Sequence, residues 1–169
     1  NVAEKPTGNL SLGVSFSSTE KLAFAASVKQ DNVFGSGNYL GVDVNTSKYS
    51  RALVLSTVDP YFTIDGVSRA IDLYYRTSRP LNSLGDEYQI ATPGASIRFG
   101  VPFSDFDTAF FGIGAELTEF TGTTSIPNAY FIYRDLYGEN SSALPLTIGW
   151  ARDQRDSVVA PSTGRYARV

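Results

Sequence analysis

Apolar and polar residues alternate along most of this chain with a period of two. In the segment LSLGVSF (10–16), for example, leucine, valine and phenylalanine alternate with serine and glycine. A period of two places successive side chains on opposite faces of a β-strand, whereas an amphipathic helix repeats about every 3.6 residues. The pattern therefore predicts an all-β chain whose strands have one apolar and one polar face.

The alternation predicts eight strands and the start of a ninth. Several are longer than the roughly 5–6 residues common in soluble sheets, and they suit the roughly 9–11 residues with which a tilted strand crosses a bilayer. A stretch at 128–137 fits either a short helix or a packed loop. The expected strands are 9–18, 21–34, 38–47, 50–59, 66–78, 87–102, 108–121 and 144–156, with the ninth beginning at Tyr166.

The segments between these strands are of two alternating kinds. Segments 18–21, 46–50, 79–87 and 121–143 are polar and lengthen along the chain, whereas 34–38, 59–66 and 101–107 are short and combine aromatic residues with Gly or Asp. Outer-membrane barrels have long external loops, short periplasmic turns and aromatic girdles at both interfaces. We therefore expect the first set outside the cell and the second set in the periplasm. The rings of Tyr61, Phe62, Phe103 and Phe106 would then lie at the level of the lipid headgroups.

A soluble β-sandwich or lipocalin-like barrel would also alternate, but its exposed face would carry many charges. Here charged residues are 18% of the chain, below the roughly 25% typical of soluble domains. The polar face is mostly Ser, Gly, Ala and Thr, which suits the lumen of a transmembrane barrel. We expect its isolated charges to face that lumen and to form ion pairs there. These are Lys29, Asp43, Asp72, Arg98 and Glu116.

Composition removes several classes of function. The chain has no cysteine and no histidine, which excludes disulfides, thiol nucleophiles, Cys/His zinc sites and histidine bases. We therefore expect no enzymatic activity, no metal and no cofactor. The net charge of −3 and the scattered Lys and Arg residues argue against nucleic-acid binding. No apolar run reaches the roughly 18 residues of a transmembrane helix.

Three segments carry a resemblance to a known family. Segment 28–42 contains Gln30, Asp31 and Asn32 followed by Gly35 and Gly37. Segment 55–68 contains Asp59, Pro60, Tyr61 and Phe62 followed by Asp65 and Gly66, and segment 146–169 contains Gly149 and Trp150 followed by Pro161 and Gly164. In this order they resemble the barrel domain of the BamA family, the outer-membrane protein assembly factors of the Omp85 superfamily.

The resemblance implies a location in the outer membrane of a Gram-negative bacterium. It also implies that residues 1–169 are one domain, an antiparallel up-and-down transmembrane β-barrel fragment with about eight of the sixteen strands of the parent barrel. Both ends look cut, so we expect the POTRA domains and the C-terminal barrel strands of the family to be absent from this chain.

The function that the resemblance implies is physical rather than catalytic. In that family the first strand is a poorly paired edge, which receives a strand of a nascent outer-membrane protein by β-augmentation. Gly13 would help another backbone to approach, although it can equally relieve crowding inside a barrel. The expected edge is Gly8, Asn9, Leu10, Ser11, Leu12, Gly13, Val14, Ser15 and Phe16.

The expected partners are the lipid bilayer, nascent outer-membrane proteins and, for the full-length protein, the Bam lipoproteins. For the two motif turns at 30–37 and 59–66 we expect turn formation in the periplasm rather than ligand binding. Two alternatives stay open. The chain could close alone as an eight-stranded structural or pore-forming barrel, or it could pair edge to edge with a second copy, in both cases without assembly activity.

Overall fold

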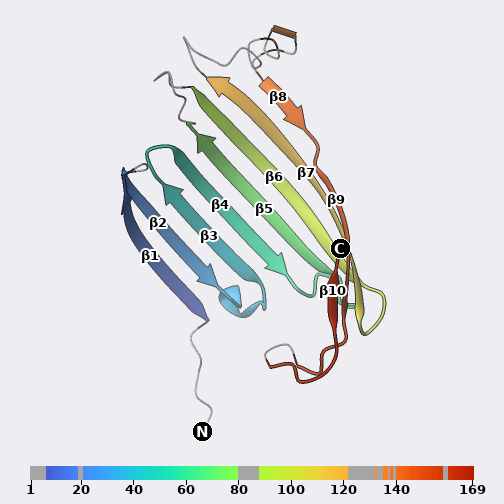
Figure 1. The fold of residues 1–169 in the computed structure, drawn as a ribbon. Helices are drawn as coiled ribbons and strands as arrows, with labels where there is room; N and C mark the ends of the chain where they lie inside the picture. Colours follow the sequence, from blue (N-terminus) through green and yellow to red (C-terminus); the bar gives the residue numbers. More distant parts are fainter. Residues whose placement is uncertain are drawn as a thin grey trace.

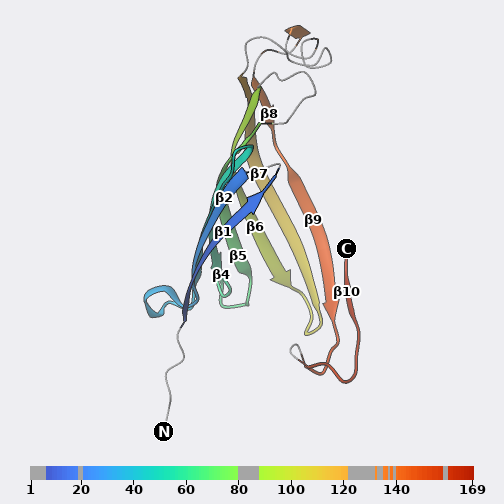
Figure 2. The same ribbon diagram turned by 60° about the vertical axis from the view of Figure 1, so that its left-hand side comes forward.

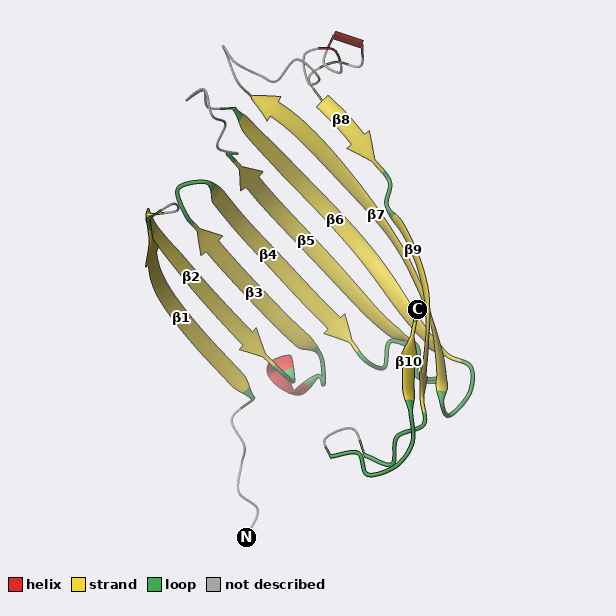
Figure 3. Cartoon of the chain, in the orientation of Figure 1, coloured by secondary structure: helices red, strands yellow, loops and turns green. Residues whose placement is uncertain are grey.

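The computed structural model describes residues 7–18, 21–79, 88–121, 132, 135–136, 138, 140–157 and 160–169. They form one antiparallel sheet in which neighbours in sequence are neighbours in space (Figures 1 and 3), so the predicted up-and-down fold class is confirmed. The strands are β1 (Gly8–Ser17), β2 (Lys21–Gln30), β3 (Tyr39–Thr46), β4 (Ser50–Asp59), β5 (Ser68–Ser78), β6 (Gln89–Pro102), β7 (Asp107–Thr121), β8 (Asn140–Ala143), β9 (Leu146–Asp153) and β10 (Tyr166–Arg168), with a short 3-10 helix η1 (Val33–Gly35) between β2 and β3.

The sheet is a single curved layer with two free edges. Strand order runs from β1 through β7 to β9 and β10, and β8 also pairs with β7. Figure 2 shows β1 at one side of the layer and β10 at the other. Because no pairing joins these two edges among the described strands, the chain does not form the small closed barrel that its strand number left open. Within the described residues, no helix is long and apolar enough to cross a membrane.

The strand register places apolar side chains in continuous rows on one face. One such row runs across five strands, and the row beside it on the opposite face contains three short polar residues followed by a valine and a tyrosine. If one strand shifted by one residue along its neighbour, its apolar side chains would move to the polar face of the sheet. The alternation of apolar and polar residues therefore fixes the register. The apolar row is Leu12, Ala26, Val44, Leu53 and Tyr75, and the opposite row is Ser11, Ser27, Asp43, Val54 and Tyr74.

The described residues form no protein core around the apolar face. The only apolar residues among them that are buried are Ala91 and Ala151, and no large side chain is fully buried. Leu12 is 76% exposed and Ile148 is 81% exposed. A soluble chain of this size would bury about 70% of the surface that its unfolded state exposes. The apolar face is therefore a surface for lipid, and the expected orientation of the two faces is confirmed.

The sheet curves away from its apolar face. On β4, Leu53 and Leu55 are exposed on that face, whereas Val54 and Ser56 are half-buried on the other. Curvature spreads the side chains on the convex side and crowds those on the concave side. The Ser- and Gly-rich face is therefore the inner, lumen face.

The second strand is shorter than the predicted 21–34. It ends at Gln30, and the next residues form η1 and a tight turn. Asn32 and Phe34 have φ values of 66° and 51°, a left-handed conformation that ends a strand. Asn32 Oδ1 accepts a hydrogen bond from the Gly37 amide at 2.6 Å. The Asn32 side chain therefore provides a hydrogen-bond acceptor for a backbone amide of the turn, which a neighbouring strand would provide if β2 continued.

The prediction of an eighth strand at 144–156 was wrong at both ends. The strand is divided into β8 and β9 by Leu144 and Pro145, and residues 154–156 follow it. Both parts pair with β7 in one register, since Glu116 faces Ala143 and Ile113 faces Leu146.

Proline explains why the pairing is interrupted. The Gly114 amide donates to the Pro145 carbonyl at 2.9 Å, but proline has no N–H with which to return the bond. Residues 140–143, which were expected to end a loop, therefore belong to the strand. Most of the predicted loop or helix at 128–137 lies outside the described residues.

Candidate functional site: the free edge of the first strand

Strand β1 is one edge of the sheet. All ten of its residues pair with β2, from Gly8 opposite Gln30 to Ser17 opposite Lys21. No other described strand pairs with β1, and each of its residues is exposed. In an antiparallel pair, alternate residues direct their N–H and C=O groups away from the partner strand. The outer side of β1 is therefore a row of backbone donors and acceptors open to another strand.

The two faces of this edge are chemically distinct. Its apolar side chains continue the lipid-facing rows of β2 and are between 67% and 76% exposed. They are Leu10, Leu12, Val14 and Phe16. Ser11, Gly13 and Ser15 lie on the lumen face. A strand added here would continue both faces only if its own sequence alternated in the same way.

The start of β1 is held to the end of β2. The Gln30 side-chain amide donates to Thr7 Oγ1 at 2.7 Å, and the Asp31 backbone amide donates to the Thr7 carbonyl at 2.8 Å. These bonds fix the N-terminal end of β1 to the turn that contains Asn32. Two of the motif residues at 30–32 thereby position the edge as well as the turn, a role that sequence reasoning did not assign.

Gly13 is not required by packing against β2. A Cβ at this position would lie 3.8 Å from the Ala25 Cβ, which is an ordinary contact distance. At Gly8 a Cβ would lie 2.5 Å from Gln30 Oε1, the mobile end of a long side chain. The described neighbours therefore give no support to the alternative in which Gly13 relieves crowding.

The lumen face beside the edge is hollowed. A depression of 370 Å³ crosses β1 to β4, and its lumen-facing lining is made of small or short side chains. The Ser27 hydroxyl oxygen is buried there and has no hydrogen-bond partner. Although the sequence indicated a lumen rich in Ser, Gly and Ala, only the register shows that these residues gather next to β1. The depression includes Ser11, Gly13, Ala25, Ser27, Asp43 and Ala52.

The second motif turn, at 59–66, is built from local hydrogen bonds. Asp59 Oδ1 accepts from the Tyr61 amide at 3.2 Å, and the Gly66 amide donates to the Thr63 carbonyl at 3.1 Å. Gly66 has a φ of 80°, which favours glycine. Tyr61 is 79% exposed.

One ring of this turn lies on the apolar face. The Phe62 ring centre is 6.1 Å from that of Phe99, and the Arg69 guanidinium lies 4.1 Å from the Phe62 ring centre. Arg69 also forms an ion pair with Asp59 at 3.8 Å. A ring with a cation and a carboxylate beside it suits the boundary between lipid and water.

The lumen charges are only partly paired. Arg98 and Asp72 form an ion pair at 2.6 Å, as expected, and the Ser56 hydroxyl donates to the same carboxylate at 2.7 Å. Lys29 and Asp43 form no ion pair within the described part of the chain. Glu116 accepts a hydrogen bond from Tyr74 at 2.7 Å. No group of three or more acidic, His or Cys residues in the described ranges could hold a metal ion.

Trp150 of the Gly149-Trp150 motif donates a hydrogen bond to the buried carboxylate of Asp107. Asp107 accepts hydrogen bonds from Trp150 Nε1 at 3.1 Å and from the Ser104 hydroxyl at 3.0 Å, and its carboxylate pairs with Arg152 at 3.3 Å. Trp150 therefore fixes the end of β9 to the start of β7, which the motif alone did not reveal.

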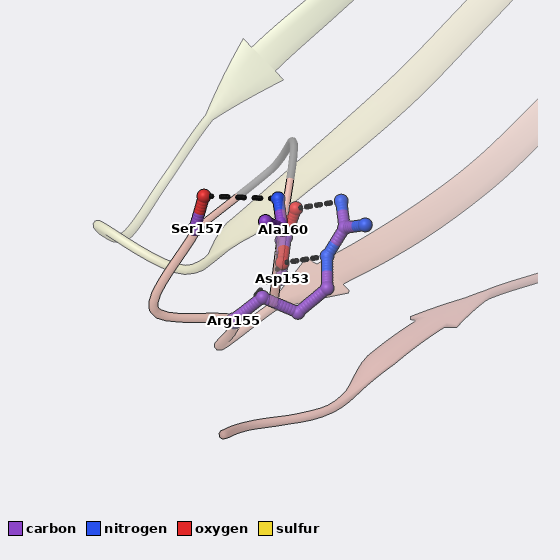
Figure 4. Close-up of polar contacts among 4 residues, drawn as sticks. All are labelled: Asp153, Arg155, Ser157 and Ala160. Carbon is purple, nitrogen blue, oxygen red and sulfur yellow. Dashed lines mark hydrogen bonds and ion pairs between the residues drawn. The ribbon is translucent and has the colours of Figure 1, made fainter. Parts of the chain in front are cut away.

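The connection after β9 is held by its own side chains. Asp153 accepts two hydrogen bonds from the Arg155 guanidinium, at 2.9 and 2.7 Å, and the Ser157 hydroxyl accepts one from the Ala160 amide at 3.2 Å (Figure 4). The Ser162 hydroxyl and the Thr163 amide donate to Asp156 and lower the pKa of its carboxyl to about 2.

Comparisons with known proteins agree on one family. The model of the Omp85 superfamily domain matches residues 32–169. The outer membrane protein assembly factor BamA of Neisseria meningitidis is 32% identical and matches 100% of this chain, which covers 22% of that protein. BamA of Nitratidesulfovibrio vulgaris is 26% identical, and the match covers 96% of this chain and 20% of that protein. The chain thus spans about a fifth of the length of these relatives.

A solved structure shows the same fold. The crystal structure of Haemophilus ducreyi BamA lacking POTRA domains 1–3 superimposes with a TM-score of 0.69 at 24% identity, over 98% of this chain and 33% of that one. The family match covers most of the sequence, and it agrees with the open antiparallel sheet, the lipid-facing rows and the three motifs. The chain belongs to the Omp85 superfamily of the Gram-negative outer membrane.

Proposed function

We propose that this chain is part of the central subunit of an outer-membrane β-barrel assembly machinery, which folds and inserts outer-membrane proteins by β-augmentation at β1. The observation that carries the proposal is the free, fully exposed edge formed by Gly8 to Phe16. The relatives that match most of the chain are outer membrane protein assembly factors. Because the chain covers about a fifth of their length, the activity proposed is that of the full-length protein.

The edge addresses the main obstacle to inserting a β-strand into a bilayer. Each unpaired backbone N–H or C=O group in hydrocarbon costs several kcal/mol, so a strand cannot enter lipid alone. Pairing with β1 would satisfy the groups on one side of the client strand as it enters. The next client strand would then pair with the first, and so on.

Side chains add selectivity to this backbone pairing. A client strand on β1 would set its outward residues beside Leu10, Leu12 and Val14, and its inward residues beside Ser11 and Gly13. An alternating strand, apolar outward and polar inward, continues both faces. A client strand that slipped by one residue would place polar groups in lipid. The depression beside Ser11 and Gly13 leaves room for inward-facing client side chains of different sizes.

Site-specific crosslinking in the full-length protein tests this proposal. Ser11→Cys is placed on the edge, and Ser27→Cys is its matched control, because Ser27 faces Ser11 on β2 and points to the same lumen face. With a client that carries a cysteine in its terminal strand, we expect a disulfide to Ser11→Cys during assembly and none to Ser27→Cys. If Ser11→Cys gave no product, or if both positions crosslinked equally, β1 would not be the receiving edge.

The two free edges favour a second possibility for the isolated 169-residue chain. Edge β1 of one copy could pair with the β9–β10 edge of another, so that two copies form one larger barrel without assembly activity. Native mass spectrometry of the detergent complex decides this. We expect the mass of two copies for the isolated chain, whereas a complex with one copy would exclude edge-to-edge pairing. The Bam lipoproteins are proposed as partners of the full-length protein alone.

A further inference from the structure

A groove lies on the apolar face, well away from the β1 edge. It has a volume of 740 Å³ and extends over β4 to β8. This volume is within the range of about 300–1,000 Å³ that small-molecule sites occupy. The walls of the groove on this face include Leu53, Leu73, Tyr75 and Leu117, and its floor includes Ala95 and Ala115.

The sizes of the side chains explain why the groove forms. Ala95 faces Ala115 across β6 and β7, and Leu73 faces Ala95 from β5. The neighbouring row places Tyr75 opposite Pro93. Two adjacent alanines beside leucine and tyrosine leave a groove whose exposed lining is mostly apolar. Its position on the lipid-facing side makes an acyl chain the natural occupant.

Two arginines lie beyond one end of the groove, although neither of them lines it. Arg51 lies two residues from Leu53 on β4 and therefore shares its face one side-chain row higher. The Arg79 amide donates to the Tyr49 carbonyl at 2.7 Å, which continues the β4–β5 register and makes Arg79 a diagonal neighbour of Arg51. The two arginines thus occupy neighbouring positions at one end of the apolar face.

Neither arginine has an acidic partner in the described part of the chain. Arg79 Nε donates to the neutral Gln89 side chain at 2.9 Å, and Arg51 is exposed. The Lys48 ammonium, 5.0 Å from the Tyr49 ring centre, adds a third positive charge at this end. Glu119 lies on the same face, but its strand β7 is three strands from Arg51 on β4 and two strands from β5, which Arg79 follows, or about 14 and 10 Å at the usual spacing.

We propose that this groove is a binding site for a phosphorylated lipid of the external leaflet. One acyl chain lies in the channel above Ala95 and Ala115, and a headgroup phosphate lies between Arg51 and Arg79. Guanidinium groups bind phosphate through paired, charge-assisted hydrogen bonds, which gives a role to two arginines that have no carboxylate partner among the described residues. The inference rests on the proposed function, and on the expectation from the sequence that the segment 46–50 is external.

Native mass spectrometry of the full-length protein in detergent tests the site, with diphosphoryl lipid A and its dephosphorylated form as probes. We expect Arg51→Gln combined with Arg79→Gln to weaken retention of the diphosphoryl form by about tenfold, because charge-assisted bonds are lost. Retention of the dephosphorylated form should not change. Lys29→Gln removes a lumen charge and is the matched control, which should leave both unchanged.

A second variant tests the acyl channel. Ala115→Leu fills the floor of the groove and should weaken retention of both probes, whereas Ala26→Leu, on the same face at β2, should weaken neither. The proposal is overturned if the arginine variant behaves like Lys29→Gln, or if Ala115→Leu behaves like Ala26→Leu. An unchanged heat-dependent gel shift checks that each variant is folded.

The two proposals fail separately. Crosslinking of a client to Ser11→Cys in the arginine background reports on the edge alone. Loss of lipid retention with normal crosslinking supports the groove as an independent site. Equal lipid retention in all variants with normal crosslinking would refute the groove and leave the edge. Loss of crosslinking in the unaltered background would refute the edge and leave the groove.

Discussion

At the scale of single residues, Tyr74 holds three strands together on the lumen face. It faces Gly94 on β6, and Gly94 in turn faces Glu116 on β7. The Tyr74 ring lies over Gly94, where a Cβ would overlap it, and the hydroxyl donates to Glu116 at 2.7 Å. The absence of a side chain at Gly94 is what lets the tyrosine reach across β6.

Gly94→Ala should therefore destabilise the barrel by displacing this ring. We expect a loss of about 1–3 kcal/mol in the free energy of unfolding, the usual cost of an overpacked site. Gly13→Ala is the matched control, because a Cβ there meets Ala25 at an ordinary 3.8 Å. Urea unfolding in lipid vesicles measures both variants. Equal urea midpoints of unfolding for Gly94→Ala and Gly13→Ala would show that the position of the Tyr74 ring does not depend on a glycine at residue 94.

Asp156 gives a prediction about pH. Its pKa is lowered from 3.8 to about 2, first by the Ser162 hydroxyl and then by the Thr163 amide. A lowered folded-state pKa means that the carboxylate stabilises its loop above pH 3.8, and that this contribution is lost as the pH falls towards 2. We expect no change in the loop between pH 8 and 5.

The Ser162→Ala variant isolates the cause of this shift. Removing the hydroxyl should raise the pKa of Asp156 towards 3.8, as measured by a carboxyl carbon chemical-shift titration. Ser157→Ala, in the same connection, should leave the pKa of Asp156 unchanged, because the Ser157 hydroxyl accepts a hydrogen bond from the Ala160 amide. A titration of Asp156 near pH 4 in the unaltered protein would disprove the assignment.

At the scale of elements, proline shapes the last strands. Gly114 and Pro145 face each other in the β7 register, but only the bond from the Gly114 amide forms. Sequence patterning placed the start of this strand at 144 because the apolar alternation begins there. It missed Asn140–Ala143, since NSSA contains no large apolar residue and shows no apolar alternation. Only pairing with β7 makes these residues a strand.

Pro145→Ala should join β8 and β9 into one strand. The new amide at position 145 would face the Gly114 carbonyl and complete the reciprocal pair of hydrogen bonds. We expect slow hydrogen exchange at this amide and a gain of up to about 1 kcal/mol in stability. Hydrogen exchange read by mass spectrometry measures it, with the Ser141 amide in the same strand for comparison. Exchange as fast as that of an amide without a hydrogen bond would contradict the prediction.

At the scale of the whole molecule, the sheet has a lipid face and a lumen face but no protein core. Leu55 and Val54 are neighbours near the middle of β4 and point to opposite faces. This pair allows the two faces to be compared at one depth in the bilayer.

Leu55→Arg should cost far more than Val54→Arg. A charged residue on the lipid face at the bilayer midplane costs about 2–4 kcal/mol, whereas one in the lumen can remain hydrated. Equilibrium unfolding from lipid vesicles measures the difference, and both variants carry the same new charge. Equal costs, or a larger cost for Val54→Arg, would contradict the assignment of the faces.

The sequence by itself determined the strands and their faces, because side chains on a strand alternate and lipid rewards an unbroken apolar side. The spans 50–59 and 108–121 differ from β4 and β7 by no more than one residue. The motifs at 30–37, 59–66 and 149–164 also indicated the family. Local turn geometry was harder to predict, since β2 ends at Gln30 and the left-handed Asn32 and Phe34 form a turn where the strand was expected to continue to residue 34.

Tertiary structure alone decided which residues meet across strands. Leu53, Ala95 and Ala115 are far apart in the sequence, and the groove that they help to form follows from register between strands rather than from any local pattern. The same holds for Tyr74 with Glu116 and for Asp107 with Trp150. Strand pairing fixes these contacts because each hydrogen-bonded register aligns distant residues in one row. The free edge of β1 likewise depends on which strand stands next to it.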